Sequence, residues 1–565
     1  MVRSVVMLLI SFSFSLFAAF SASDYSEAMR MAVKFFGGQR CGNTHNWMLV
    51  ESTDPNTTDE CHTRDSYNGH DVTGGWHDCG DHIKVAVTMG YAAICLLSAY
   101  DIWPSAFEDD HDQNYEPGEN GIEDVLEEVK IATDYFMKCL IDGNTFVYYV
   151  GNATDHVCWV TSSYQSTLGA DKGGDPRSVT ATQNAGGAQA ADYASALALM
   201  ALNYPDDDYA QECREAAIAY YEFAKKYQSN ISIPEFYSSP NPEISDEYAL
   251  AGILMYRLIG DSTYRTDAVA ALSGKWESNS ALAWDTKADI AYYYLVKDNP
   301  AVNNGERSGT CKKFLRRNIS AAVKGVNSWG IPWGFFKNNW GTNKLACGSA
   351  YPAALYAKLV EDEVIPEDDS LPLETANEFN RKIIDYMLGG NEFGHPFLHG
   401  YKGDMTHKVH HRNAMGKNEL NFDANAKNSA SFMFKSGALI GGPMSQGQFQ
   451  NIVEGGNAFM ETESGCDYNG PFVAALANIV AKLDPKVSAK PKYFRKSCVQ
   501  PSSASCHIAN GRIQLNGISA RRLTICRMDG SVAASMQPGA AVSVSRGVYL
   551  VRAEGVRPMR LVVAR

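Results

Sequence analysis

Two carboxylates stand three residues apart on a glycine-rich stretch near the start of the chain. They are Asp78 and Asp81, in the run Gly-Gly-Trp-His-Asp-Cys-Gly-Asp-His that begins at Gly74. The run leads into apolar residues with helical spacing, so both carboxylates can point at one spot near a helix N-terminus, which favours their ionised forms. A general base that activates water needs that state. An ordinary helix-capping loop would show the same residues, so the run alone leaves both interpretations open.

A second acidic group lies near the other end of the helical region. Glu461, Glu463 and Asp467 precede an apolar run that reaches Leu483. A buried Glu463 could donate a proton to a leaving oxygen, because apolar and acidic neighbours raise the pKa of a carboxylic acid. Acids that cap a helix are the alternative interpretation.

Three histidines and an arginine form a third group. His407, His410 and His411 stand within five residues, and Arg412 follows them. Such histidines can bind a metal, but the same window offers no paired carboxylate. Hydrogen bonding to a polar substrate is the favoured interpretation.

The elements that must position these groups are mostly helices. Apolar residues recur at helical spacing in about eleven segments, and Asn120 is the expected N-cap of the third. Strand alternation is sparse, as at 146–150. Many helices joined by long loops indicate an α/α toroid or an α-solenoid, and the absence of a fixed sequence period favours the toroid. The predicted helices cover about 26–36, 83–97, 120–136, 187–203, 209–227, 245–260, 286–297, 310–324, 346–361, 373–388 and 470–483.

The first 22 residues have the pattern of a secretory signal peptide. Arg3 precedes an apolar run from Val5 to Phe20, and small residues follow, with cleavage expected after Ser21 or close by. A membrane anchor is the alternative, but the run is short for a bilayer span. We therefore expect a secreted or cell-surface protein without a membrane span. Its thirteen cysteines suggest some disulfides and at least one free thiol.

The composition changes after residue 484. Residues 485–505 are rich in Lys, Pro and Ser and read as a linker, and 506–565 show short alternating apolar runs typical of a small β-sandwich. From Pro485 onward, 14 Lys and Arg stand against two acids, while the whole chain carries a net charge of −14. The acidic body excludes nucleic acid as the expected partner.

Across residues 24–484 the sequence resembles glycoside hydrolase family 9. That resemblance implies an all-α catalytic domain, residues 23–484, with an (α/α)6 barrel fold. It also implies a secreted endo-β-1,4-glucanase, or cellulase, that acts on cellulose or related β-glucans by an inverting acid/base mechanism and needs no cofactor for its chemistry. The matching motifs are Tyr25-Ser26-Glu27-Ala28, Gln39-Arg40-Cys41-Gly42, Trp76 to His82 (the family's D-A-G-D-H/N loop), Tyr386 to Asn391, His410-His411-Arg412 and Glu463 to Asn469.

The same resemblance implies roles for individual residues. Asp81 aligns with the catalytic base, Asp78 with the aspartate that helps hold the water, and Glu463 with the general acid. The implied substrate contacts are His156, Trp159, Trp340, His410, Arg412 and Tyr468. Tryptophan faces suit the apolar C–H faces of sugars, although core packing is the alternative at Trp159 and Trp340.

The resemblance also implies a calcium site and a role for the C-terminal region, and the sequence departs from the family pattern at two places. Asp246, Glu247 and Asp285 stand where many family members bind calcium, an ion that prefers oxygen ligands. Lys344 replaces an expected arginine after Trp340, and Glu454 to Phe459 departs from the family's D-x-R-x-x-Y element. Residues 506–565 resemble bacterial C-terminal sorting domains, which implies recognition by an outer-membrane secretion machinery. A glucan-binding protein without catalysis, or a lyase or xylanase on the same toroid, would be the competing functions.

Overall fold

A computed structural model describes most of the chain. It covers residues 20–47, 58–233, 235–239, 244–271, 281–297, 319–332, 340–415, 437–453 and 459–486, together with the backbone of strands between 505 and 563.

In this described part, six helices form a closed inner ring. Each contacts the next, and the last returns to the first. Every residue of the helix α3 (Ala86–Ile102) except Asp101 is buried, as expected of a helix that is apolar on all sides. The ring consists of α3 (Ala86–Ile102), α6 (Gly187–Asn203), α8 (Ser245–Ile259), α10 (Ala288–Lys297), α14 (Thr342–Glu361) and α18 (Cys466–Leu483).

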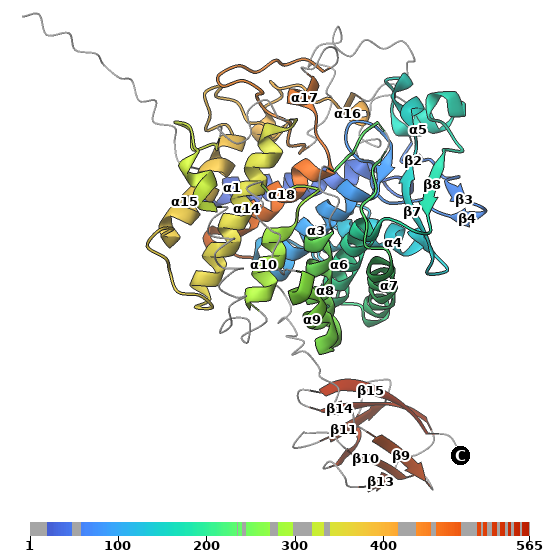
Figure 1. Cartoon of the computed structure of the whole chain (residues 1–565). Coiled ribbons are helices and arrows are strands. Elements are labelled where there is room, and N and C mark those ends of the chain that lie inside the picture. Colours follow the sequence, from blue (N-terminus) through green and yellow to red (C-terminus); the bar gives the residue numbers. More distant parts are fainter. Residues whose placement is uncertain are drawn as a thin grey trace, which may run out of the picture.

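Further helices pack outside this ring. Helix α15 shows why: it buries Phe379, Ile383 and Met387 on one face and leaves polar residues on the other. Each outer helix contacts an inner one (Figure 1). The pairs are α1 (Ala22–Lys34) on α18, α4 (Asp124–Cys139) on α3, α7 (Asp207–Lys226) on α6, α9 (Ser262–Ala271) on α8, and α15 (Leu373–Met387) on α14. The predicted α/α toroid is confirmed.

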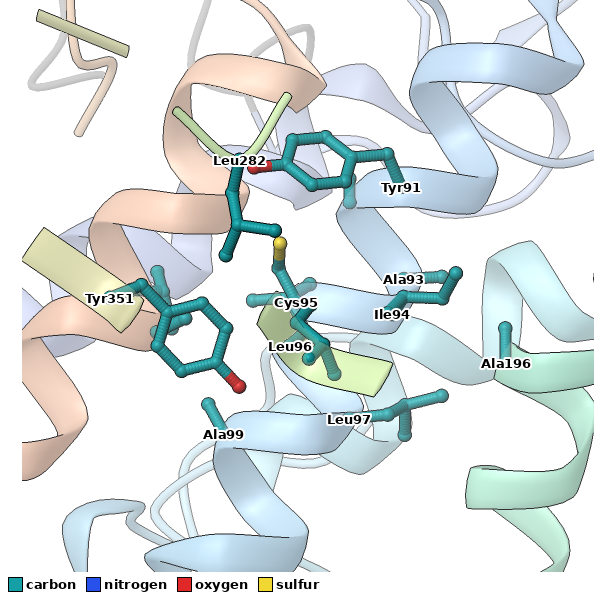
Figure 2. Close-up of a cluster of buried hydrophobic side chains, with 14 of the residues drawn as sticks. Tyr91, Ala93, Ile94, Cys95, Leu96, Leu97, Ala99, Ala196, Leu282 and Tyr351 are labelled. Carbon is teal, nitrogen blue, oxygen red and sulfur yellow. The ribbon is translucent and has the colours of Figure 1, made fainter. Parts of the chain in front are cut away.

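The core of the ring is built from side chains that neighbouring helices share. Figure 2 shows Cys95 and Leu96 of α3 together with Ala196 of α6 and Tyr351 of α14. The Tyr351 hydroxyl lies 2.8 Å from the Ser98 hydroxyl of α3, so its polar atom is satisfied inside the core. Full burial of each large apolar side chain stabilises the fold by about 1.5–3 kcal/mol.

Short strands and turns fill the loops between helices. One antiparallel sheet joins β5 (Lys84–Val85), β7 (Thr145–Val150), β6 (Leu140–Ile141) and β8 (Val179–Thr182). It includes the strand predicted at 146–150. The other short elements are β1 (Gly42–Asn43), β2 (Glu60–Cys61), β3 (Ser66–Tyr67), β4 (His70–Asp71), η1 (Phe35–Gln39), η2 (Pro104–Ala106), η3 (Ala153–Val157), α5 (Ser162–Ser166), η4 (Ala170–Lys172), η5 (Tyr401–Gly403), α16 (Arg412–Met415) and α17 (Phe459–Thr462).

The C-terminal residues form two antiparallel sheets. One has the strand order β13-β10-β9 and the other β12-β11-β14-β15. Their positions agree with the alternating apolar runs of the sequence. The strands are β9 (Ser505–Ala509), β10 (Arg512–Asn516), β11 (Leu523–Arg527), β12 (Val532–Met536), β13 (Ala541–Ser543), β14 (Gly547–Ala553) and β15 (Val556–Val563).

Some helix boundaries differ from the sequence prediction. Helix α4 begins at Asp124, so Asn120 is not its N-cap; the Asn120 side chain instead donates a hydrogen bond to Glu127 at 2.8 Å. Helix α18 begins at Cys466 rather than near 470, and α9 was not predicted. Of the helix predicted at 310–324, residues 319–324 are helical and the rest lies outside the described residues.

Two further predictions from the sequence were that the chain has no membrane span and that some of its cysteines form disulfides. None of the described helices combines the length and apolar character that crossing a bilayer requires. The nine cysteines of the described residues are all buried and free. The predicted disulfides therefore do not form among these nine, and the other four cysteines lie outside the described side chains.

Candidate active site

Three loops that are distant in sequence meet at one place. The backbone N–H of Cys466 donates to the Asp78 carbonyl at 2.9 Å, and that of Arg412 donates to the Gly80 carbonyl at 2.9 Å. The His410 N–H completes the junction by donating to the Thr462 carbonyl at 2.8 Å. A Cβ atom at Gly80 would lie 2.1 Å from the His410 carbonyl oxygen, so only glycine allows this approach. The loops bring together all three of the motifs singled out in the sequence.

Asp81 is a buried carboxylate that the site keeps ionised. Its Oδ2 lies 2.9 Å from the Cys79 sulfur and 3.3 Å from His156 Nε2, and its Oδ1 accepts the Ile83 N–H at 3.2 Å. Burial alone would raise the pKa of Asp81. The hydrogen bond and charge of His156, the charge of Arg412 and the Cys79 thiol outweigh burial and hold that pKa below its usual value.

Asp78 behaves in the opposite way. Burial and the neighbouring charges of Asp81 and Asp467 raise its pKa well above the usual value, although Thr88 and Tyr237 donate hydrogen bonds to it. The expectation that a helix N-terminus keeps both aspartates ionised is therefore wrong for Asp78. Two close buried carboxylates do not both ionise readily, and their pKa values are pushed apart.

Glu463 is placed to hold a proton. Burial raises the pKa of Glu463 to about 7, despite the lowering effects of a hydrogen bond from Trp340 and the charge of Lys344. The Tyr468 hydroxyl donates to its Oε2 at 3.2 Å, and the Trp340 indole N–H donates to the same atom. A carboxylic acid with this pKa can serve as a general acid near neutral pH.

The predicted substrate contacts fall into two groups. His156 and Trp340 are exposed beside the carboxylates, with 36% of the His156 side chain and 47% of Trp340 accessible to solvent. Trp159 and Arg412 are buried, and the Arg412 guanidinium lies 5.3 Å from the centre of the Trp159 ring. The ring of His410 meets Trp159 edge-on at 4.9 Å.

The two buried side chains differ in how their polar atoms are satisfied. Arg412 Nε donates to the Cys158 carbonyl at 3.1 Å, and Arg412 Nη1 lies 3.5 Å from Asp155 Oδ2. Arg412 thus holds the loops around Asp81. The buried indole N–H of Trp159 has no hydrogen-bond partner in the described part of the chain, so it remains able to donate to a ligand.

The histidines of the third motif separate in the structure. His410 lies beside the segment from Glu461 to Gly465 that carries Glu463, called the acid loop below, but His411 is buried with its Nε2 2.6 Å from Gln39 Oε1. His407 stacks on Phe397 at 5.0 Å instead. Among the described residues, these three histidines do not form a group that could hold one metal ion.

Sequence reasoning missed two side chains that contact Asp78. Tyr237 donates its hydroxyl to Asp78 Oδ2 at 2.6 Å, and the Thr88 hydroxyl donates to Oδ1. Tyr237 comes from a loop with no recognisable motif, and Thr88 looks like one residue of an apolar helix. Neither position carries a local signal that could have revealed its contact.

A possible metal site was also missed. One ligand atom from each of Cys41, Cys61, His62 and His77 lies within 4.8 Å of the others, and all four residues are buried. Two thiolates and two imidazoles match the tetrahedral ligand set that zinc prefers in structural sites. The spacing hides the site, because no C-x-x-C pair occurs and the ligands come from three separate segments.

The predicted calcium ligands hold a lysine in the structure. Asp246 and Glu247 lie in the first turn of α8, where Asp246 Oδ2 accepts the backbone N–H of Lys287 at 2.6 Å. The Lys287 ammonium lies 3.2 Å from Glu247 Oε1 and 3.0 Å from Asp192 Oδ2. Among the described residues, Asp246, Glu247 and Asp285 do not form a group of ligand atoms within 4.8 Å of one another.

Comparisons with known proteins agree with this geometry. Residues 25–476 match the model of glycosyl hydrolase family 9. Endoglucanase A of Fibrobacter succinogenes is 35% identical over 267 residues, which cover 45% of this chain and 58% of that protein. Endoglucanase A of Bacillus pumilus is 26% identical over 498 residues, which cover 84% and 69%. The crystal structure of the cellulase Cel9M of C. cellulolyticum with cellobiose superposes with a TM-score of 0.65 at 25% identity, covering 81% of this chain and 98% of that one.

Proposed function

Because this chain belongs to glycosyl hydrolase family 9, with the (α/α)6 barrel of that family, we propose that it is an endo-β-1,4-glucanase, a cellulase. The substrate would be cellulose or a related β-glucan. The names of the similar endoglucanases and the cellobiose bound to the similar cellulase support this substrate class. The observation that carries the proposal is the opposite pKa shift of Asp81 and Glu463 at one junction of loops.

The proposed reaction is a single displacement with inversion. Glu463 gives its proton to the departing glucosidic oxygen while Asp81 takes a proton from the attacking water. Asp78, which Tyr237 and Thr88 hold in place, helps to orient that water. Two carboxyl groups whose environments push their pKa values apart are well suited to act as an acid and a base.

The glucan chain would lie across the exposed side chains beside the carboxylates. Trp340 presents nearly half of its surface to solvent and touches Glu463, so a sugar stacked on it would lie next to the acid. His156 stacks on Phe236 at 4.9 Å and contacts Asp81, which places it next to the base. Trp159, His410, Arg412 and Tyr468 complete the proposed substrate contacts.

Replacement of the acid tests the function. Glu463→Gln removes the donated proton but keeps the shape of the side chain, so we expect binding of glucan to persist while turnover of unactivated glucan falls by about 10²–10⁴-fold. Hydrolysis of carboxymethyl-cellulose by the purified variant is the measurement, and retained binding of cello-oligosaccharide is its control. Near-normal turnover would overturn the assignment of Glu463.

We also propose that the two ends of the chain direct its export from the cell. Residues 1–22 would be a signal peptide, 23–484 the catalytic domain, 485–505 a linker and 506–565 a β-sandwich read by an outer-membrane secretion machinery, which makes the enzyme secreted or bound to the cell surface. The two antiparallel sheets between 505 and 563 and the excess of basic residues there support a separate C-terminal unit.

Structural calcium is a further part of the proposal. Glu247 Oε2 is buried and accepts no hydrogen bond from the described residues. Burial and the charge of Asp246 raise the pKa of Glu247 well above its usual value, since Lys287 does not neutralise all of these acids. Oxygen atoms of Asp246, Glu247 and Asp285 are of the type that calcium prefers, and an ion bound at the start of α8 would replace the Lys287 ammonium, which now lies 3.2 Å from Glu247 Oε1.

A further inference from the structure

The loop from Gly74 to His82, which carries Asp78 and Asp81 and is called the base loop below, contains a thiol that touches the proposed base. Cys79 lies between Asp78 and Asp81, is 7% exposed and forms no disulfide. Its sulfur lies 2.9 Å from Asp81 Oδ2, with the thiol as donor. The motif that this loop resembles has alanine at that position, so the donor is a feature of this chain.

The contacts of the Asp81 carboxylate show what the thiol adds. Oδ1 accepts the Ile83 N–H, whereas the contacts that Oδ2 makes with the described residues come from two side chains, the Cys79 thiol and His156 Nε2. His156 is partly exposed and changes its charge with pH, while a thiol remains a donor throughout the acidic range. The thiol is therefore the pH-independent donor to the oxygen that faces His156.

Cys79 also connects the base loop to the acid loop. A Cβ atom at Gly465 would lie 2.9 Å from Cys79 Cβ, so the two loops are in close contact at this point. The Gln39 side chain donates to the Cys79 carbonyl at 2.9 Å and fixes the backbone. These contacts leave the thiol little freedom to point elsewhere than at Asp81.

We propose that Cys79 is a positioning residue that holds the Asp81 carboxylate, ionised and in one orientation, through a thiol hydrogen bond. The inference rests on the proposed role of Asp81 as the base. A hydrogen bond to the charged form of a carboxylate favours that form, so its loss raises the pKa of Asp81. The acidic limb of the pH profile then moves to higher pH, because the base must be ionised to act.

Other charged groups also face Asp81, and the test must separate Cys79 from them. They are Asp78 from the same loop, His156 from η3, Arg412 from α16, His410 and His411 from the loop before α16, Glu463 from the acid loop, Cys466 from α18 and Tyr149 from β7. All of these remain in place when only position 79 is changed, so a shift of the acidic limb reports the thiol itself.

The experiment compares Cys79→Ala with Cys79→Ser in the full-length enzyme. The alanine variant should lower kcat on a soluble β-glucan about three- to tenfold, leave KM unchanged and shift the acidic limb of kcat/KM to higher pH. The serine variant retains a donor and should keep its acidic limb closer to that of the unchanged enzyme. Cys79→Val supplies a second variant without a donor if the alanine variant fails to fold.

Cys466→Ala is the matched control. The Cys466 thiol lies in the same pair of loops but donates to the His77 carbonyl at 3.2 Å, so its loss should lower the melting temperature without moving the acidic limb. An unchanged acidic limb in the variants without a donor, or equal shifts in the serine and alanine variants, would overturn the role of Cys79. Retained activity of Asp81→Ala would instead overturn the proposed base, which distinguishes the two failures.

Discussion

At the scale of single residues, the groups around each buried carboxylate decide the chemistry that it can perform. Asp81 and Glu463 are both buried, yet their pKa values move in opposite directions. His156, Arg412 and Cys79 outweigh the burial of Asp81 and favour its charged form, whereas Trp340 and Lys344 do not outweigh the burial of Glu463. Neighbouring groups, rather than exposure, therefore distinguish the proposed base from the proposed acid.

The pKa of Glu463 predicts the alkaline limit of activity. Glu463 acts only when it is protonated, so kcat/KM should fall as pH rises through about 7, by about tenfold for each further pH unit. The Lys344 ammonium lowers the pKa of Glu463 and pairs with Asp467 at 2.7 Å. Lys344→Met should therefore move the alkaline limb to higher pH. Measurement of kcat/KM across the neutral pH range checks the alkaline limb of the unchanged enzyme and its shift in Lys344→Met. An alkaline limb near the ordinary pKa of glutamic acid would contradict the role of Glu463 as the acid.

The proposed displacement also predicts the stereochemistry of the product. If water attacks from the face opposite the leaving group, the new reducing end appears first as the α-anomer. Proton NMR of the initial product is the direct measurement. Asp81→Ala should be nearly inactive and partly rescued by azide, with an α-glycosyl azide as product. A β-anomer as first product would mean retention and two displacements.

Some of these residues could be found in the sequence and others could not. Asp78, Asp81 and Glu463 stand in short motifs whose spacing carries chemical meaning. Tyr237 and Thr88 reach Asp78 only because the fold brings their segments to the loop. Local patterns predict what a residue type can do, whereas a partner from a distant segment becomes visible only in the folded chain.

At the scale of elements, the same distinction explains the errors in the helix predictions. Apolar residues located the inner helices, because these helices are buried at nearly every position and are therefore rich in apolar residues over more than three turns. Asn120 was expected to cap α4, but it lies before the helix begins, and its side chain donates a hydrogen bond to Glu127 in the first turn of α4. Helix α18 continues through Pro471 and begins earlier than its apolar pattern, since its first turn carries Asp467 and Tyr468 of the active site.

The Cys41, Cys61, His62 and His77 cluster predicts a bound zinc ion that holds the loops before the base. Metal analysis should find zinc in the purified enzyme, and a strong chelator should lower the melting temperature by about 5 °C or more, since removal of the ion leaves the ligands unpaired. Cys61→Ser should melt lower than the unchanged enzyme and show no further effect of chelator. If the purified enzyme contains no zinc and the chelator leaves its melting temperature unchanged, the prediction of a zinc site is wrong.

At the scale of the whole molecule, the composition of the two parts predicts independent roles. Deletion of residues from about 500 onward should leave purified enzyme with full activity, because all of the active-site residues lie before 484. Delivery to the surface or medium of the native host should be lost. The measurements are glucanase activity of the purified truncated protein and the amount exported. Loss of folding on truncation would show that the C-terminal strands belong to the catalytic unit.

The contact between α3 and α18 can form only near the end of synthesis of the chain. Helix α3 follows the base loop and is translated early, whereas α18 follows Glu463 and is translated last among the ring helices. A nascent chain therefore carries the proposed base long before it carries the proposed acid. Until α18 packs between α3 and α14, Glu463 is not held opposite Asp81, so we expect no hydrolysis of glucan before the ring has closed.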